Sequence, residues 1–233
     1  DRSPSRGLGD VYKRQHASNV TGTAKLLKTI FDTAGLPAHL FNVLIIEHDQ
    51  SNAIIEHDLV RGVTLTGSPV AGEKIGEKAG AQLKKTVLEL GSNDAYLVLD
   101  DADIDVAVEK SVMGRIYNNG ETCIAAKRFI ATEKVYDEFK EKFVKAMDAL
   151  KVGDPKNEDT ELGPMAREDL REKIHEQVQE SVEKGANVLC GGKIPDGEGY
   201  FYPATVLANV TPGQPAYDCL LYTSPSPRDG LLS

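Results

Sequence analysis

Alternation of helical patterns with short apolar runs is the feature that most constrains how this chain can fold. Residues 19–34 carry apolar side chains at helical spacing, and a glycine and a proline follow that run. Residues 41–46 then form a continuous apolar stretch, which is typical of a buried parallel strand. The same order is repeated at residues 51–57 and 62–66. This alternation predicts βαβ units over a parallel sheet.

The first half is therefore expected to be Rossmann-like, and the second half predicts a further α/β arrangement. A turn-rich link joins two short strands expected at residues 86–90 and 95–99. The remaining helices are expected at 69–84, 103–117, 134–149 and 165–184, and the remaining strands at 127–132, 186–190 and 201–206. The aspartate-rich run at residues 100–105 precedes a helix, so we interpret it as helix capping and not as a cation site.

Composition narrows the class of partner. The chain has 233 residues and a formal net charge of -9, and its basic residues are scattered among acidic ones, which argues against a nucleic-acid surface. No apolar run approaches the roughly 18 residues of a membrane span, and the N-terminus lacks the apolar core of a secretory signal. The three cysteines and five histidines show no metal-ligand spacing. We therefore expect a cytoplasmic protein with reduced thiols, no metal and a small-molecule partner.

The two ends of the chain differ from its middle and are related to each other through DNA. One permitted choice of codons for residues 219–229 gives a DNA sequence whose reverse complement is informative. When that reverse complement is followed by one G and read one base out of phase, it encodes residues 5–15. A flexible Ser/Pro-rich tail explains the composition but not this complementarity. Residues 1–15 and 219–233 are therefore predicted to be translated sequencing adaptors, and the natural segment to be truncated at both ends.

Three ordered motifs give the middle of the chain a specific resemblance. They are Leu88-Glu89-Leu90-Gly91, the aspartate-rich run at 100–105, and Asn118-Asn119-Gly120-Glu121-Thr122-Cys123. The first and last resemble the Glu-Leu-Gly and Asn-x-Gly-[Gln/Glu]-x-Cys signatures of the aldehyde dehydrogenase superfamily. The glutamate precedes the cysteine by 34 residues, close to the family spacing. The resemblance covers residues 16–218 and includes the Leu-Gly-Pro-Met segment at 162–165.

This resemblance implies oxidation of an aldehyde with NAD or NADP through a thiohemiacetal and a thioester. Cys123 would be the nucleophile, and its backbone N–H would be one oxyanion donor. Glu89, a carboxylate between two leucines, would be the base that activates water. Glu121 replaces the commoner family glutamine and is interpreted as a loop-stabilising group, although it is a rival for the base. The family's second oxyanion donor is an asparagine that would lie upstream of His16.

The nucleotide contacts are also implied by the resemblance. Residues 67–72 follow a strand and open a helix, as the family's pyrophosphate contact does, with Gly67 and Ser68 meeting the phosphates at the helix N-terminus. Taken alone, this stretch is ordinary turn chemistry. Leu90 belongs to the same set of cofactor contacts. Ser18 lies where the family addresses the adenosine ribose and would leave room for a 2′-phosphate, so NAD and NADP both stay open.

The implied organisation is a partial NAD(P)-binding domain at residues 16–88 and a partial catalytic domain at residues 89–218. Within the superfamily, the motifs are most similar to those of bacterial succinate-semialdehyde dehydrogenases. Arg115 is a candidate for binding the substrate carboxylate, because guanidinium matches carboxylate geometry. Some relatives instead carry an arginine where this chain has Tyr117. The parent protein would be a homo-oligomer, whereas the chain itself would be a non-catalytic fragment with at most weak nucleotide binding.

Overall fold

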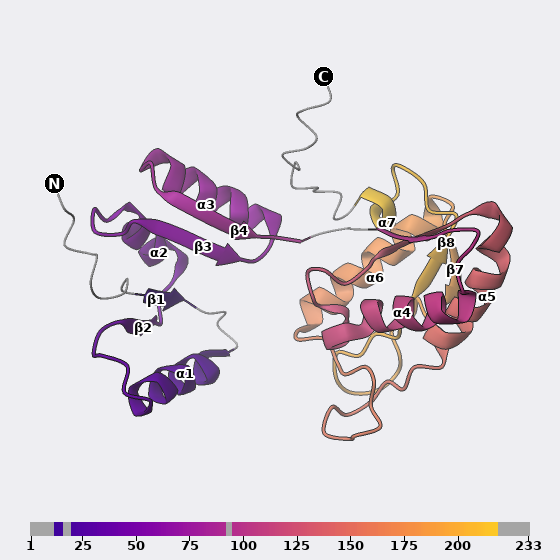
Figure 1. The fold of residues 1–233 in the computed structure, drawn as a ribbon, viewed down its shortest axis with the longest axis horizontal. Coiled ribbons are helices and arrows are strands. Elements are labelled where there is room, and N and C mark those ends of the chain that lie inside the picture. The colour runs from indigo at the N-terminus through magenta and orange to yellow at the C-terminus, as the bar shows by residue number, and fades with distance from the viewer. Residues whose placement is uncertain (1–11, 16–19, 92–94, 219–233) are drawn as a thin grey trace. The chain divides into compact units, whose positions relative to one another are not determined.

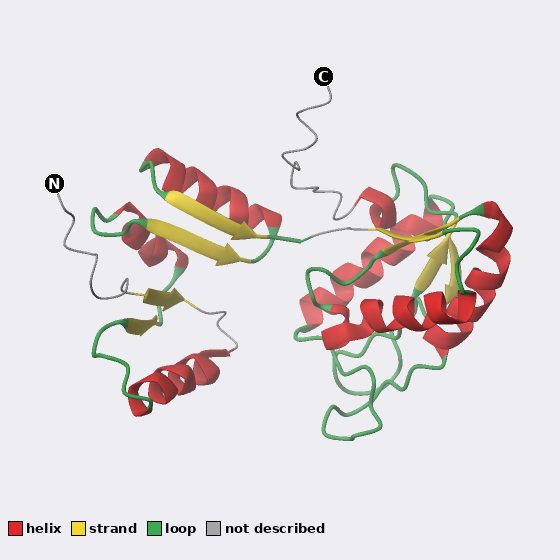
Figure 2. Ribbon diagram, in the orientation of Figure 1, coloured by secondary structure: helices red, strands yellow, loops and turns green. Residues whose placement is uncertain are grey.

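The computed structural model describes residues 12–15, 20–91 and 95–218 (Figure 1). The chain divides into two compact units. Unit 1 contains the chain up to residue 65 together with 71–88, and unit 2 contains residues 66–70 together with the chain from 89 onward. Each unit combines helices with short two-stranded sheets (Figure 2). None of the described helices has both the length and the apolar character needed to cross a membrane.

Unit 1 begins with a βαβ arrangement. The strands β1 (Tyr12–Gln15) and β2 (Phe41–Leu44) pair in parallel, and helix α1 (Thr21–Thr33) connects them. The ring of Phe31, near the end of the helix, lies 4.8 Å from that of Phe41. The pair forms a parallel βαβ connection of the kind predicted for this half, although no strand was predicted at residues 12–15.

Strand β1 lies inside the segment that the sequence predicts to be adaptor-derived. Pairing with β2 uses the main-chain N–H and C=O groups, which every residue except proline carries in full. A strand at residues 12–15 can therefore form whatever its side chains are. The foreign origin of the two ends stays a prediction.

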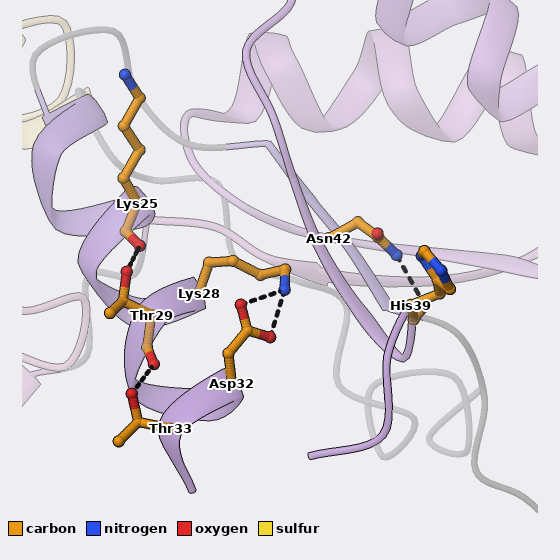
Figure 3. Close-up of polar contacts among 7 residues, drawn as sticks. All are labelled: Lys25, Lys28, Thr29, Asp32, Thr33, His39 and Asn42. Carbon is orange, nitrogen blue, oxygen red and sulfur yellow. Dashed lines mark hydrogen bonds and ion pairs between the residues drawn. The ribbon is translucent and has the colours of Figure 1, made fainter. Parts of the chain in front are cut away.

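Side chains on helix α1 make local polar contacts within the helix (Figure 3). The hydroxyls of Thr29 and Thr33 donate to the carbonyls of Lys25 and Thr29 at 3.3 and 2.8 Å, and the Lys28 ammonium pairs with Asp32 one turn later. Of the apolar stripe predicted for this helix, Ala24 is buried, whereas Val20, Ile30 and Phe31 are exposed. The predicted helix is confirmed, but its apolar face is only partly covered.

The rest of unit 1 repeats helix and strand. It contains α2 (His48–Glu56), β3 (Gly62–Thr66), α3 (Pro69–Ala81) and β4 (Lys85–Glu89), and β3 pairs with β4. The two strands run side by side in the same direction (Figure 2). The Lys84 ammonium donates to the carbonyls of Ile55 and His57. This lysine therefore satisfies carbonyls at the C-terminal end of α2 that the helix leaves without partners.

Unit 2 contains a third parallel pair. The strands β5 (Ala95–Val98) and β6 (Arg128–Ala131) flank helix α4 (Ile104–Ile116) and the short 3-10 turn η2 (Tyr117–Gly120). Asp103 caps α4, since its carboxylate accepts the backbone N–H of Val106 at 3.1 Å. The interpretation of the aspartate-rich run as a helix start is confirmed at this residue.

The C-terminal part of unit 2 contains the long helices α5 (Glu133–Asp148) and α6 (Glu168–Glu183) and the short α7 (Pro215–Asp218). The strands β7 (Asn187–Cys190) and β8 (Val206–Ala208) pair antiparallel. The strand predicted at 201–206 is wrong over most of its length, because β8 starts only at Val206. Pro203 has no N–H to give to a ladder. In addition, the Thr205 hydroxyl is occupied, donating to the Pro203 carbonyl at 3.0 Å and accepting from the Gly192 N–H at 2.9 Å.

The core of unit 2 lies where α4 and α5 cover β5 and β6. Its buried members are Val98, Ile104, Val108, Val135, Phe139, Phe143, Met147 and Cys190. Phe143 is central, with its ring 5.4 Å from that of Phe139 in a stacked arrangement and 4.7 Å from that of Phe129. Tyr96 of β5 reaches across to α4, where a side chain at Gly114 would place a Cβ only 2.4 Å from its hydroxyl. The core therefore fixes α4 against the sheet.

Truncating the central aromatic should destabilise unit 2. Phe143→Ala is expected to lower the free energy of unfolding by about 3 to 5 kcal/mol, because the cavity it leaves can close only in part. Tyr136→Ala is the control on the same helix, where the side chain is exposed, and should cost about 1 kcal/mol or less. Urea unfolding of the 233-residue chain followed by circular dichroism measures both. Equal losses for the two variants would contradict this core.

Candidate active site

Cys123 lies on the loop that runs from the end of α4 through η2 into β6. Its side chain is exposed, and its thiol is free. The other described cysteine, Cys190, is buried in the core, and burial raises the pKa of its thiol. Among the described residues, the thiol that a small molecule can reach is therefore the one the motif predicts.

The turn before Cys123 has an uncommon backbone. Three consecutive residues, Asn118, Asn119 and Gly120, have positive φ angles of 52°, 59° and 72°. Asparagine tolerates this left-handed region better than most residues, and glycine enters it freely. The Asn118 carbonyl closes the turn by accepting the N–H of Glu121 at 3.0 Å. Strained backbone of this kind persists only where its surroundings over-determine it, and it clusters at functional sites.

The Arg115 guanidinium holds this turn from within. It donates to the carbonyl of Gly120 at 3.0 Å and to that of Ala126 at 3.3 Å, so it bridges the two sides of the loop that carries Cys123. Burial lowers the pKa of this guanidinium. A side chain at Gly120 would place a Cβ 2.5 Å from the Arg115 Nη2 atom, so the bridge requires glycine there.

The expectation that Arg115 receives a substrate carboxylate is not supported. Its guanidinium is engaged by main-chain carbonyls and is half-buried in the loop, so it serves the turn. Sequence spacing alone places an arginine near the cysteine but does not say which way its side chain points. The equivalent arginine position of some relatives is Tyr117 here, and that side chain is exposed.

Four further contacts complete the loop. The Lys127 ammonium donates to the carbonyls of Cys123 and Ala125 at 3.2 and 3.0 Å. The Thr122 carbonyl accepts the N–H of Ala125 at 2.9 Å, and the Thr122 hydroxyl donates to the carbonyl of Tyr117 at 3.1 Å. The Thr122 carbonyl and the Cys123 N–H belong to one planar peptide group. The bond from the Ala125 N–H to the Thr122 carbonyl therefore also fixes the direction of the Cys123 N–H.

One side chain ties the turn to a distant segment. The Asn119 carboxamide oxygen accepts the N–H of Gly163 at 3.0 Å, and its nitrogen lies 3.5 Å from the carbonyl oxygen of Pro164. Sequence reasoning singled out the Leu-Gly-Pro-Met segment but gave it no role. It missed the bracing roles of Arg115, Asn119 and Lys127, since no spacing rule links these residues to their acceptors.

The predicted base lies in a different local setting. Glu89 is the last residue of β4, its side chain is exposed, and its carbonyl accepts the N–H of Gly67 at 3.0 Å. Across the described ranges, no hydrogen bond or ion pair joins the Glu89 carboxylate to Cys123. Glu121 is exposed as well, and within the same ranges its carboxylate makes no hydrogen bond or ion pair. The loop-stabilising role predicted for the Glu121 side chain is therefore not seen.

The predicted nucleotide contacts are described in part. Helix α3 begins at Pro69, as predicted, directly after the exposed Gly67 and Ser68. A strand, an exposed Gly-Ser turn and a helix N-terminus of this kind fit a phosphate group. Leu90 follows β4 and is half-buried, and Ser18 lies outside the described residues. Across the described part of the chain, no cluster of three or more His, Cys, Asp or Glu side chains could hold a metal ion.

Comparison with known proteins places this loop in context. A model of the aldehyde dehydrogenase family matches residues 11–218. The chain belongs to the aldehyde dehydrogenase family. The predicted α/β fold of this family is confirmed by similarity to solved structures, among them the succinic semialdehyde dehydrogenase from Streptococcus pyogenes in complex with NADP+. That structure gives a TM-score of 0.84 at 38% identity over 89% of this chain and 45% of its own.

Curated relatives point in the same direction. Succinate semialdehyde dehydrogenase (NAD(P)+) Sad of Escherichia coli K12 is 47% identical over 209 residues, which cover 90% of this chain and 45% of that protein. Succinate-semialdehyde dehydrogenase (NADP(+)) of Mycobacterium leprae is 45% identical over 221 residues, covering 95% and 47% respectively. The aldehyde dehydrogenase chain described here therefore spans about half the length of the curated relatives it matches.

Removing the guanidinium should loosen the loop. Arg115→Met is expected to lower the free energy of unfolding of unit 2 by about 2 kcal/mol, because two partly buried carbonyls lose a charged donor. Arg167→Met removes the same charge from an exposed pair with Asp169 and should change stability little. Urea titration of both variants and the parent sequence measures the difference. Matching midpoints for the two variants would show that Arg115 does not brace the loop.

Proposed function

We propose that residues 16–218 are the central part of an enzyme that oxidises an aldehyde, best supported as succinate semialdehyde, to its carboxylic acid with NAD or NADP. The observation that carries this proposal is the exposed thiol of Cys123 on a braced left-handed turn within the family motif. Family membership supports the same reading. The protein is proposed to act in the cytoplasm, and its oligomeric state stays a prediction.

The proposed chemistry begins at Cys123. Its sulfur, as thiolate, forms a bond to the aldehyde carbon, and the carbonyl electron pair moves onto oxygen to give a thiohemiacetal anion. The N–H of Cys123 would donate to that oxygen, and the bond between the Thr122 carbonyl and Ala125 holds this N–H in place in advance. NAD(P)+, when bound, supplies the acceptor for the hydride that leaves the same carbon. Cys123 then carries a thioester.

Hydrolysis of the thioester completes the proposed cycle. Glu89 would take a proton from water as the water oxygen attacks the thioester carbon. The carbon–sulfur bond then breaks, the carboxylic acid leaves, the sulfur of Cys123 returns as thiolate, and Glu89 releases its proton to solvent. The exposure of Glu89 leaves it open to water, which supports this assignment.

The proposed cofactor and substrate are supported by the named relatives and by the turn before α3. The exposed Gly67 and Ser68 and the N-terminus of α3 would hold the pyrophosphate, with Leu90 and Ser18 as further contacts. The named relatives include one that uses NAD(P)+ and one that uses NADP+. The same relatives are named as succinate-semialdehyde dehydrogenases, which supports that substrate. Two of the five Arg115 N–H groups serve the loop, so we propose a group other than Arg115 as the main contact of the substrate carboxylate.

We propose a second function for the 233-residue chain as it stands, namely a non-catalytic segment with at most weak nucleotide binding. Its coverage of about half of each curated relative supports this proposal. The family's second oxyanion donor, an asparagine upstream of His16, would be supplied only by the complete enzyme. Loss of such a donor costs about a hundredfold or more in rate.

Substitution of the nucleophile tests the proposed reaction. In the complete enzyme, Cys123→Ala should reduce aldehyde oxidation with NAD and NADP by more than about a thousandfold, because no thiohemiacetal can form. Cys190→Ala removes the buried thiol and should keep most of the activity. Formation of NAD(P)H, followed by absorbance, is the measurement, with calorimetry of nucleotide binding to the 233-residue chain alongside. An active Cys123→Ala enzyme would refute the assignment, and rapid turnover by the 233-residue chain would refute its non-catalytic role.

The base can be tested separately from the nucleophile. Glu89→Gln in the complete enzyme should lower the steady-state rate by about a hundredfold, because water attacks the thioester without a base. A first burst of about one NAD(P)H per active site should persist, since it precedes hydrolysis. Glu121→Gln is the matched control, because it restores the commoner family residue and should leave the rate close to that of the parent. Stopped-flow absorbance separates the two phases, and an unchanged steady-state rate for Glu89→Gln would eliminate this base.

A further inference from the structure

Asn119 joins the turn before Cys123 to a segment more than forty residues later in the chain. Its carboxamide oxygen accepts the Gly163 N–H at 3.0 Å, and its carboxamide nitrogen lies within 3.5 Å of the Pro164 carbonyl. Both contacts are partly buried. Arg115, in contrast, braces the same loop through the nearby carbonyls of Gly120 and Ala126. The carboxamide therefore adds a long-range tie to a local brace.

The segment that receives this tie is itself fixed. Leu162 is buried, its N–H donates to the carbonyl of Lys151 at 3.1 Å, and its own carbonyl accepts the N–H of Gly153 at 3.0 Å. Two residues beyond Gly163, the N–H of Met165 donates to the carbonyl of Tyr200 at 2.9 Å. Gly163 thus lies between two anchored residues. The bond from its N–H to the Asn119 carboxamide therefore restrains where the Asn119 side chain lies.

The backbone at Asn119 shows why such a tie is needed. A left-handed conformation costs most residues with a side chain about 1 to 2 kcal/mol and asparagine less, and Asn118 and Asn119 adopt it in succession. A turn with this cost relaxes unless several contacts oppose relaxation. Relaxation would move Cys123, which lies four residues after Asn119.

We propose that Asn119 is a positioning residue for Cys123, acting through the bond between its carboxamide oxygen and the N–H of Gly163. This inference rests on the proposed function, because it concerns the placement of the same nucleophile. A misplacement of a reacting group by about 1 Å can cost about a hundredfold in rate. Loss of one of several braces is expected to cost less than that.

Two substitutions separate the carboxamide from the backbone conformation. Asn119→Gly keeps the left-handed turn accessible but removes the carboxamide. Asn119→Asp keeps an acceptor for the N–H of Gly163 and also tolerates the left-handed region. In the complete enzyme, Asn119→Gly should lower kcat about tenfold with KM for the aldehyde changed by less than about twofold, as expected when positioning is lost and binding is kept. Asn119→Asp should retain at least about half of kcat.

A second measurement tests the tie without any turnover. Hydrogen–deuterium exchange of the 233-residue chain, read at the Gly163 amide by NMR, should be faster in Asn119→Gly and close to the parent rate in Asn119→Asp. Unchanged exchange in Asn119→Gly would overturn the tie. A parent-like kcat in that variant would overturn the positioning role while leaving the proposed function intact. If the complete enzyme oxidises no aldehyde, the proposed function fails, and the Gly163 amide still decides whether Asn119 anchors the turn.

Discussion

The site depends on a single guanidinium that donates into both sides of the loop around Cys123. Arg115 reaches the carbonyls of Gly120 and Ala126, three residues before and three residues after the cysteine. A loop pinned on both sides of one residue leaves that residue little freedom to move. A Cβ at Gly120 would lie 2.5 Å from the Arg115 Nη2 atom, so a side chain there would displace the guanidinium. Glycine at position 120 therefore leaves room for the Arg115 guanidinium, and it also adopts the left-handed backbone angle of the turn.

This brace has a fixed position because its helix belongs to the core. Ile104 and Val108 of α4 are buried against the aromatic cluster around Phe143, and Asp103 caps the first turn. Arg115 lies in the last turn of the same helix, so the packing at one end determines where the guanidinium lies at the other. The main-chain bonds of the loop then carry that placement to Cys123. Burial far from the thiol thus contributes directly to the geometry of the thiol.

The sequence predicted the order of elements well, and it singled out the thiol that the structure leaves exposed, whereas the catalytic role of that thiol stays a prediction. Apolar periodicity is a local property, so α4, α5 and α6 lie within a few residues of their expected bounds. The roles of Arg115 and Asn119 could not be predicted, because each depends on which way a side chain points or on a partner more than forty residues away. The prediction of a strand at 201–206 was wrong over most of its length. The apolar and aromatic residues there suggested a strand, but Pro203 has no N–H to donate to the hydrogen bonds between strands.

The charged side chains that hold the loop around Cys123 bind main-chain carbonyls of that loop. Two of the five Arg115 N–H groups serve main-chain carbonyls, so the loop around Cys123 orients this guanidinium whatever its other three N–H groups contact. A charged side chain outside the turn could be exchanged without disturbing these two bonds. The side chain of Tyr117 on η2 is exposed, and its main-chain carbonyl accepts from the Thr122 hydroxyl. In the proposed function, such a loop would hold the thiol of Cys123 in one place while the side chains around it differ.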